Sequence, residues 1–179
     1  MRKPRVWPVV FTAAATAIIL FGGWTLYKHT AVASPLHSAM NDIPGVMESS
    51  KPEVEQDQVN ISLTLEDDAN LRQVYEDVSK KSTEIAGSRS IHLQVRSESN
   101  DKLDELWSKS MFKVAEAMET KTYSKIPEAM TELTKDDQTV QTVTEMDDDN
   151  VYITLRSGDA SKYVVLPRTP ATMEVFANA

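Results

Sequence analysis

The sequence predicts an α+β fold, a two-layer α/β sandwich with two helices on one face of a mixed sheet of about five strands. The elements follow in the order β-α-β-α-β-β-β, and an N-terminal transmembrane helix precedes them. Three observations carry this prediction. Apolar and polar residues alternate in several short runs, two longer stretches space their apolar residues three or four apart, and a long charge-free run lies near the N-terminus.

The charge-free run, Val6–Tyr27, is long enough to span a membrane as a helix. Its 22 residues would extend ~33 Å, against ~30 Å for a bilayer core. Three cations lie within residues 1–5, and Lys28 alone follows the run directly. The positive-inside rule then places residues 1–5 in the cytoplasm and everything after the run outside. We therefore expect a single-pass protein of a bacterial cell membrane, with residues 6–27 as its signal anchor.

A cleaved signal peptide is the alternative for the same segment. Ala31-Val32-Ala33 matches the small-x-small pattern of a cleavage site, so cleavage after Ala33 would give a secreted protein. Against cleavage, the apolar run exceeds the usual ~7–15 residues of a signal peptide. Both interpretations place the rest of the chain outside the cytoplasmic membrane.

The chain after the apolar run divides into three predicted parts. Residues 28–58 are expected to form a flexible extracytoplasmic tether, because they contain three prolines and no sustained apolar period. Regular patterns begin at Val59, so residues 59–168 are expected to form one small α/β domain. Residues 169–179 are expected to form a frayed tail.

The first half of the predicted domain is strand, helix, strand. Residues 59–65 alternate apolar and polar side chains, as a half-buried strand does. Asp68 is a candidate N-cap and Gly87 a candidate C-cap for an amphipathic helix of about 18 residues between them. Residues 91–96 alternate again and predict the second strand.

The second half is predicted to hold two helical segments and three strands. Asn100 or Asp101 caps an amphipathic helix that ends near Thr122, and a short helix is expected at residues 127–133. Turn signals separate the strands that follow. These strands are predicted at residues 139–144, 151–156 and 163–166.

The charge of the chain argues against nucleic acid as a partner. The formal net charge is −8, and the residues after the first 28 hold 15 cations against 27 acids, a net of −12. Such a chain repels phosphates instead of releasing their counterions. The chain has no cysteine, which excludes disulfides and thiolate metal sites.

No catalytic, metal-binding or cofactor-binding residue is expected. His92 is the only histidine in the predicted domain, and no Gly-x-Ser-x-Gly turn supplies a nucleophile beside it. Ser110 and Lys113 match a Ser-x-x-Lys string, but they lie inside a predicted helix. The acids at 66–68 and 147–149 lack the spacing of a calcium loop, and a helix cap and a hairpin turn explain them better.

The polar face of the predicted sheet is the candidate binding surface. Alternation directs the polar residues of two strands away from the helices, and no remaining segment is predicted to cover them. The candidate partner-binding residues are His92, Gln94, Arg96, Tyr152, Thr154 and Arg156. Arginine and tyrosine are enriched in protein interfaces. The alternative is a solvated sheet face without a ligand.

The second predicted helix carries a further apolar group, Trp107, Met111, Phe112 and Met118. These side chains could line a peptide groove, but their helical spacing favours a place in the core.

These expectations describe a non-enzymatic, membrane-anchored extracytoplasmic interaction module that docks on another envelope or membrane protein. The alternative function is binding of cell-wall glycan by Tyr152 and its sheet face. The layout of residues 59–168 resembles the small α/β glycan-binding domains of bacterial division and sporulation proteins, and also the ring-building domains of envelope machines. No motif carries this resemblance to one family. The partner, the strand order and the oligomeric state stay open.

Overall fold

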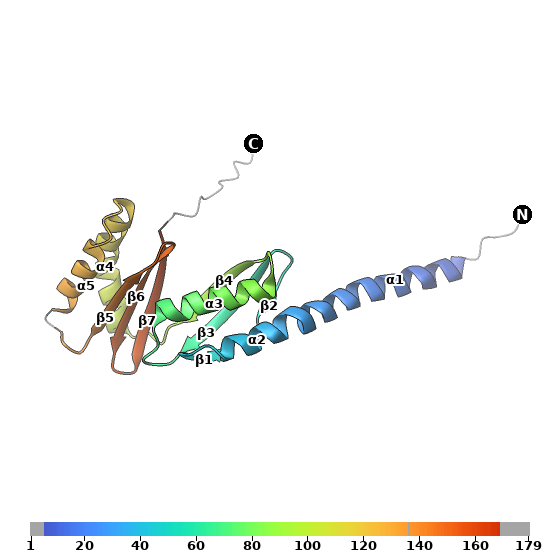
Figure 1. Cartoon of the computed structure of the whole chain (residues 1–179), viewed down its shortest axis with the longest axis horizontal. Coiled ribbons are helices and arrows are strands. Elements are labelled where there is room, and N and C mark those ends of the chain that lie inside the picture. Colours follow the sequence, from blue (N-terminus) through green and yellow to red (C-terminus); the bar gives the residue numbers. More distant parts are fainter. Residues whose placement is uncertain (1–5, 136, 169–179) are drawn as a thin grey trace, which may run out of the picture. The chain divides into compact units, whose positions relative to one another are not determined.

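The structure, a computed structural model, describes residues 6–135 and 137–168 (Figure 1). The chain divides into two compact units, which we treat separately. Unit 1 comprises the residues up to Leu63 together with Asp77–Gln94, and unit 2 comprises Thr64–Glu76 together with the residues from Val95 onward. The predicted single domain at 59–168 is therefore divided between two units.

The elements alternate along the chain in an order close to the predicted one. The N-terminal elements are α1 (Val6–Tyr27), a π-helical turn η1 (Lys28–Ala33), α2 (Ser34–Asn41), β1 (Val46–Ser49), β2 (Glu53–Val54), β3 (Gln58–Leu65), α3 (Leu71–Ala86) and β4 (Ser90–Arg96). The C-terminal elements are α4 (Asp101–Glu119), α5 (Lys125–Thr134), β5 (Gln141–Met146), β6 (Asn150–Ser157) and β7 (Ala160–Pro167).

The predicted single mixed sheet is wrong, because the strands form two separate sheets. In the first, β3 pairs with β1, β2 and β4. In the second, β5, β6 and β7 form an antiparallel meander in which Met146 lies opposite Val151 and Ser157 opposite Ala160. Tight turns join the three strands of the meander, so each meets an antiparallel partner at once and needs no crossover to the first sheet.

The predicted transmembrane helix is also wrong. α1 occupies the predicted segment, and the side chains of residues 10–20 are exposed. Among the residues that the structure describes, no helix combines the length and the apolarity needed to cross a membrane. Residues 1–5, the predicted cytoplasmic end, lie outside the described part.

The predicted tether at residues 28–58 is wrong, because this segment is folded into unit 1. Leu36 and Met40 of α2 are fully buried. The Asn41 side chain accepts a hydrogen bond from the N–H of Ser49 at 2.9 Å, which ties α2 to β1. The N–H of Ser50 donates to the carbonyl of Ser62 at 2.8 Å, which continues the pairing with β3. The isolated apolar residues were too sparse to show a period, yet Leu36, Met40, Ile43 and Val46 are all buried.

The helix ends follow the predicted capping residues in part. The Asn100 side chain accepts a hydrogen bond from the N–H of Leu103 and caps α4, as predicted. Gly87 follows α3 with φ +70°, the left-handed conformation that a C-cap glycine adopts. Asp68 is not the cap of α3: the Asn70 side chain accepts from the N–H of Gln73 at 2.9 Å and takes that role.

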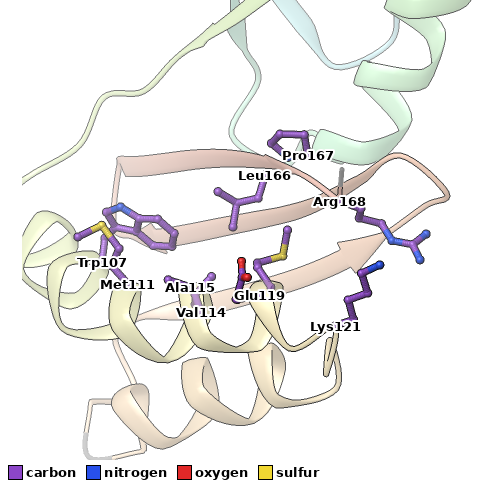
Figure 2. A pocket seen from close by; sticks show the side chains of 10 residues that line it. Trp107, Met111, Val114, Ala115, Glu119, Lys121, Leu166, Pro167 and Arg168 are labelled. Carbon is purple, nitrogen blue, oxygen red and sulfur yellow. The ribbon is translucent and has the colours of Figure 1, made fainter. Parts of the chain in front are cut away.

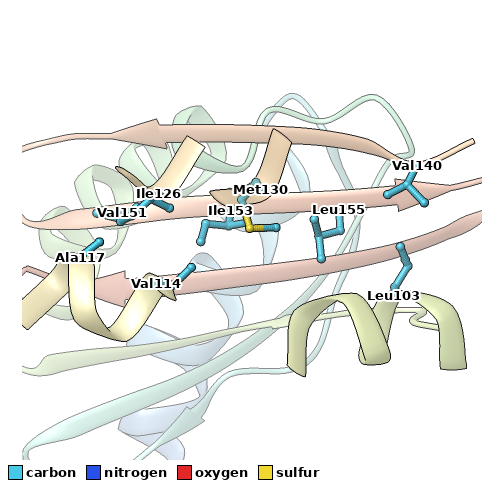
Figure 3. Packing of buried hydrophobic residues seen from close by; sticks show 9 residues of the cluster. All are labelled: Leu103, Val114, Ala117, Ile126, Met130, Val140, Val151, Ile153 and Leu155. Atoms are coloured by element: carbon cyan, nitrogen blue, oxygen red, sulfur yellow. The ribbon is translucent and has the colours of Figure 1, made fainter. Parts of the chain in front are cut away.

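The core of unit 2 lies between its two helices and one face of β6 (Figure 3). Val151, Ile153 and Leu155 alternate along β6 and point toward α4 and α5, as their period of two predicts. The helices and the loop before β5 contribute Leu103, Val114, Ala117, Ile126, Met130 and Val140. These contacts fix α4 against the sheet. One side of α4 lies next to the end of β7.

Candidate functional site

The candidate site is an apolar groove in unit 2, which we call the α4–β7 groove (Figure 2). Its volume is about 460 Å³. It is lined by Trp107, Met111, Val114, Ala115, Met118, Glu119, Lys121, Leu166, Pro167 and Arg168. Figure 2 shows the Trp107 and Met111 side chains at one end and the cations Lys121 and Arg168 at the other.

Helical spacing explains why α4 lines one wall. Residues 107, 111, 114 and 118 lie three or four apart, so they share one stripe of the helix. Val114 is 2% exposed and forms the floor, whereas Met111 is 45% exposed and forms the rim. This stripe therefore serves both the core and the groove, and it is wider than a core contact alone requires.

Lys121 is held at the cationic end by the way α4 terminates. The N–H of Thr122 donates to the carbonyl of Ala117 at 2.9 Å, and the N–H of Lys121 donates to that of Met118 at 3.2 Å. These two bonds form a Schellman motif, and they give Lys121 a φ of 53°, a conformation that glycine usually supplies. A lysine thus occupies a position where glycine would be less strained.

Arg168 is fixed beside Lys121 by its own hydrogen bonds. Its Nη1 donates to the carbonyls of Asp147 at 2.7 Å and Asp148 at 2.9 Å, and the guanidinium lies 4.9 Å from the centre of the Tyr123 ring. The Nε atom of Arg168 is buried and has no partner within the described residues. The guanidinium therefore keeps a hydrogen-bond donor that the protein does not use.

The loop that holds Arg168 is itself stabilised by a buried tyrosine. The hydroxyl of Tyr152 donates to Oδ2 of Asp147 at 2.6 Å, and Oδ1 accepts from the N–H groups of Asp149 and Asn150. Burial raises the pKa of Asp147, but these three hydrogen bonds outweigh it and hold the pKa below its ordinary value. Burial, followed by the bond to Asp147, raises the pKa of Tyr152. The predicted hairpin turn at residues 147–149 is confirmed, because it joins β5 and β6.

The six predicted binding residues do not share a face. His92, Gln94 and Arg96 are exposed on β4, which belongs to the four-stranded sheet. The other three lie on β6 in the three-stranded sheet, where Tyr152 is 2% and Thr154 4% exposed. The expectation of one common exposed surface is therefore wrong. A binding role for the three β4 residues stays a prediction.

The opposite face of β6 is covered by the segment Thr64–Glu76 of the same unit. The Tyr75 ring meets the Tyr152 ring edge-on with centroids 5.4 Å apart. Nη2 of Arg156 donates to the carbonyl of Ala69 at 2.7 Å. This face of β6 is therefore covered, with Tyr152 and Thr154 buried, whereas the alternation along the strand predicted a solvated face. The glycan alternative depended on an exposed Tyr152, and that support is gone.

Sequence reasoning found the residues of the groove but assigned them to the core. Trp107 and Met118 do pack half-buried against the core, as predicted. Met111 and Phe112 are 45% and 78% exposed, so the core prediction is wrong for them. The sequence did indicate a groove, because the apolar stripe of α4 is wider than one packing face needs. Only the position of β7 shows which residues of this stripe are left exposed.

The described residues hold no group of three or more His, Cys, Asp or Glu side chains placed to bind a metal ion. No protein-family model, no curated protein and no solved structure matches the chain. The candidate function therefore rests on the groove itself.

Proposed function

We propose that this chain is a non-enzymatic interaction module whose α4–β7 groove binds a short apolar segment of another protein, with an acidic residue of that segment at the Lys121–Arg168 end. The single observation that carries the proposal is the groove, in which most lining residues are apolar and the cations gather at one end.

The apolar lining supports a hydrophobic ligand. Seven of the ten lining residues (Trp107, Met111, Val114, Ala115, Met118, Leu166 and Pro167) are apolar. Burying their exposed surface would stabilise a complex by about 25 cal/mol per Å². Tryptophan and methionine are also enriched where proteins meet. The three polar residues, Glu119, Lys121 and Arg168, provide neither a nucleophile with an adjacent base nor a pair of carboxylates, which supports binding without catalysis.

The cationic end supports an acidic group in the partner. The lining contains two cations, Lys121 and Arg168, and one carboxylate, that of Glu119. The groove therefore has a net positive charge in a chain whose net charge is −8. A carboxylate seated between these two cations would form charge-assisted hydrogen bonds with them. Electrostatic complementarity of this kind contributes mainly to orientation and to the rate of association.

The edge of β7 favours side-chain contacts over an added strand. The N–H groups of Ser161 and Tyr163 already donate to the carbonyl of Glu98 and the hydroxyl of Ser97, both at 3.0 Å. Pro167 has no N–H to offer further along the same edge. A partner strand would find few backbone groups free there, so we expect apolar anchors seated in the groove instead.

A photo-crosslinking amino acid tests the proposal directly. We expect benzoylphenylalanine at position 111, which lines the groove, to form an adduct with another protein in an extract of the source cells. The adduct should map to an apolar segment with an acidic residue. The matched control is the same substitution at Phe112, an exposed apolar neighbour outside the lining. Equal adducts from both positions, or no adduct with another protein from position 111, would overturn the proposal.

A further inference from the structure

We propose that the segment Thr169–Ala179 of this chain is an occupant of the α4–β7 groove and competes there with the partner. The inference takes the chemistry of the groove from the proposed function, but it concerns a different ligand, one that belongs to the same chain.

The path of the chain brings this segment to the groove. Leu166, Pro167 and Arg168, the last three described residues, all line the groove wall (Figure 2). The described chain therefore ends, at Arg168, beside the cationic end of the groove. A ligand attached at the rim has an effective concentration in the millimolar range, so weak contacts suffice to favour occupancy.

The composition of the segment matches the lining. Met173, Val175 and Phe176 are three large apolar residues within four positions, and Glu174, between two of them, is the only charged residue after Arg168. The apolar side chains suit the wall formed by Trp107 and Met111, and the carboxylate suits Lys121.

The reach of the segment is sufficient. Phe176 is eight residues beyond Arg168, and eight extended residues span up to ~26 Å. From Met111 on α4 to Lys121, two residues beyond the end of that helix, the chain advances ten residues, or ~15 Å at the helical rise. Phe176 can therefore reach the Met111 end even if the segment is not fully extended.

Disulfide trapping in the full-length chain tests the inference, because the native chain has no cysteine. We pair Ala177→Cys, which leaves the three apolar residues in place, with Ala115→Cys in the groove. The matched control pairs Ala177→Cys with Lys113→Cys, which is exposed on α4 two residues away and about 200° around the helix. Under mild oxidation of dilute protein, we expect the groove pair to form an intrachain disulfide at least tenfold faster than the control pair.

A polar-segment variant completes the test. Replacing Met173, Val175 and Phe176 together by serine should remove the tenfold advantage of the groove pair. Rates equal within twofold for the two pairs, or an advantage that survives the serine substitutions, would overturn the inference. Failure of trapping combined with a partner adduct at position 111 leaves the proposed function standing. If trapping succeeds but no partner adduct forms at position 111, either in the native chain or in the polar-segment variant, the proposed function is rejected. The inference about residues 169–179 then still stands.

Discussion

Replacing Tyr152 by phenylalanine removes one hydroxyl from the buried contact that supports the groove. The ring of Tyr152 is 2% exposed and keeps its edge-on contact with Tyr75 in this variant. The lost hydrogen bond is the 2.6 Å bond to the Asp147 carboxylate. A hydrogen bond to a charged group contributes ~1.5–3 kcal/mol. Asp147 is half-exposed, so water partly replaces the bond, and we expect a loss of about 1.5–2 kcal/mol at pH 7.

The loss should depend on pH in a defined direction. The folded protein holds the pKa of Asp147 below its ordinary value, so the ionised carboxylate contributes stability above the unfolded pKa of ~3.9. This contribution disappears as the pH falls through the depressed folded pKa, since the carboxyl is then protonated in both states. We therefore expect the difference between wild type and Tyr152→Phe to be complete at pH 7 and smaller at pH 3.

Urea unfolding followed by far-ultraviolet circular dichroism at pH 7 and pH 3 measures both quantities. In a thermal scan, the expected loss corresponds to a Tm decrease of roughly 3–8 °C for a chain of this size. Tyr75→Phe is the matched control, because no hydrogen bond of its hydroxyl is seen within the described residues, and its effect should stay within ~0.5 kcal/mol. A loss below 0.5 kcal/mol in Tyr152→Phe, or an equal loss at both pH values, would refute this account of the Tyr152–Asp147 contact.

Three further substitutions test separate parts of the account. Asn100→Ala removes the N-cap of α4 and should lower the free energy of unfolding by about 1 kcal/mol in urea titrations; no change would contradict the capping role. Arg96→Ala, on the exposed edge of β4, should change stability by less than ~0.5 kcal/mol, and a larger loss would reveal a structural role. Lys121→Gly relieves the positive φ, so stability should stay equal or rise by up to about 1 kcal/mol while peptide binding weakens; destabilisation would disprove the strain argument.

The sequence patterns predicted most helices and strands because each pattern reflects a local cause. Alternation along β6 and the helical spacing in α4 depend on the residues of one element alone. The sheet count could not be predicted in the same way, since it depends on which strands pair. The turn signals between β5, β6 and β7 are compatible with pairing of neighbouring strands. That these three strands form a sheet of their own is seen only from their observed pairing.

The candidate site was missed for a related reason. Tyr152 and Arg156 belong to a polar alternation that predicts solvent, and nothing local shows that Tyr75 and the Ala69 carbonyl meet them from a distant segment. Met111 belongs to a stripe that predicts burial, and it is exposed only because β7 ends beside α4 without covering it. Both errors arise from tertiary contacts, which the periodicity of a single element does not contain.

The central claim, that the α4–β7 groove binds an apolar segment with an acidic residue, is tested most directly by peptide binding. A fluorescein-labelled peptide of residues 169–179 is titrated by fluorescence anisotropy with the variant whose own Met173, Val175 and Phe176 are serines. The claim predicts saturable binding that Met111→Glu weakens at least tenfold and that Phe112→Glu, the neighbouring substitution outside the lining, leaves within twofold. The same Kd in both glutamate variants would contradict the claim, whereas no binding at all would contradict the inference that residues 169–179 occupy the groove.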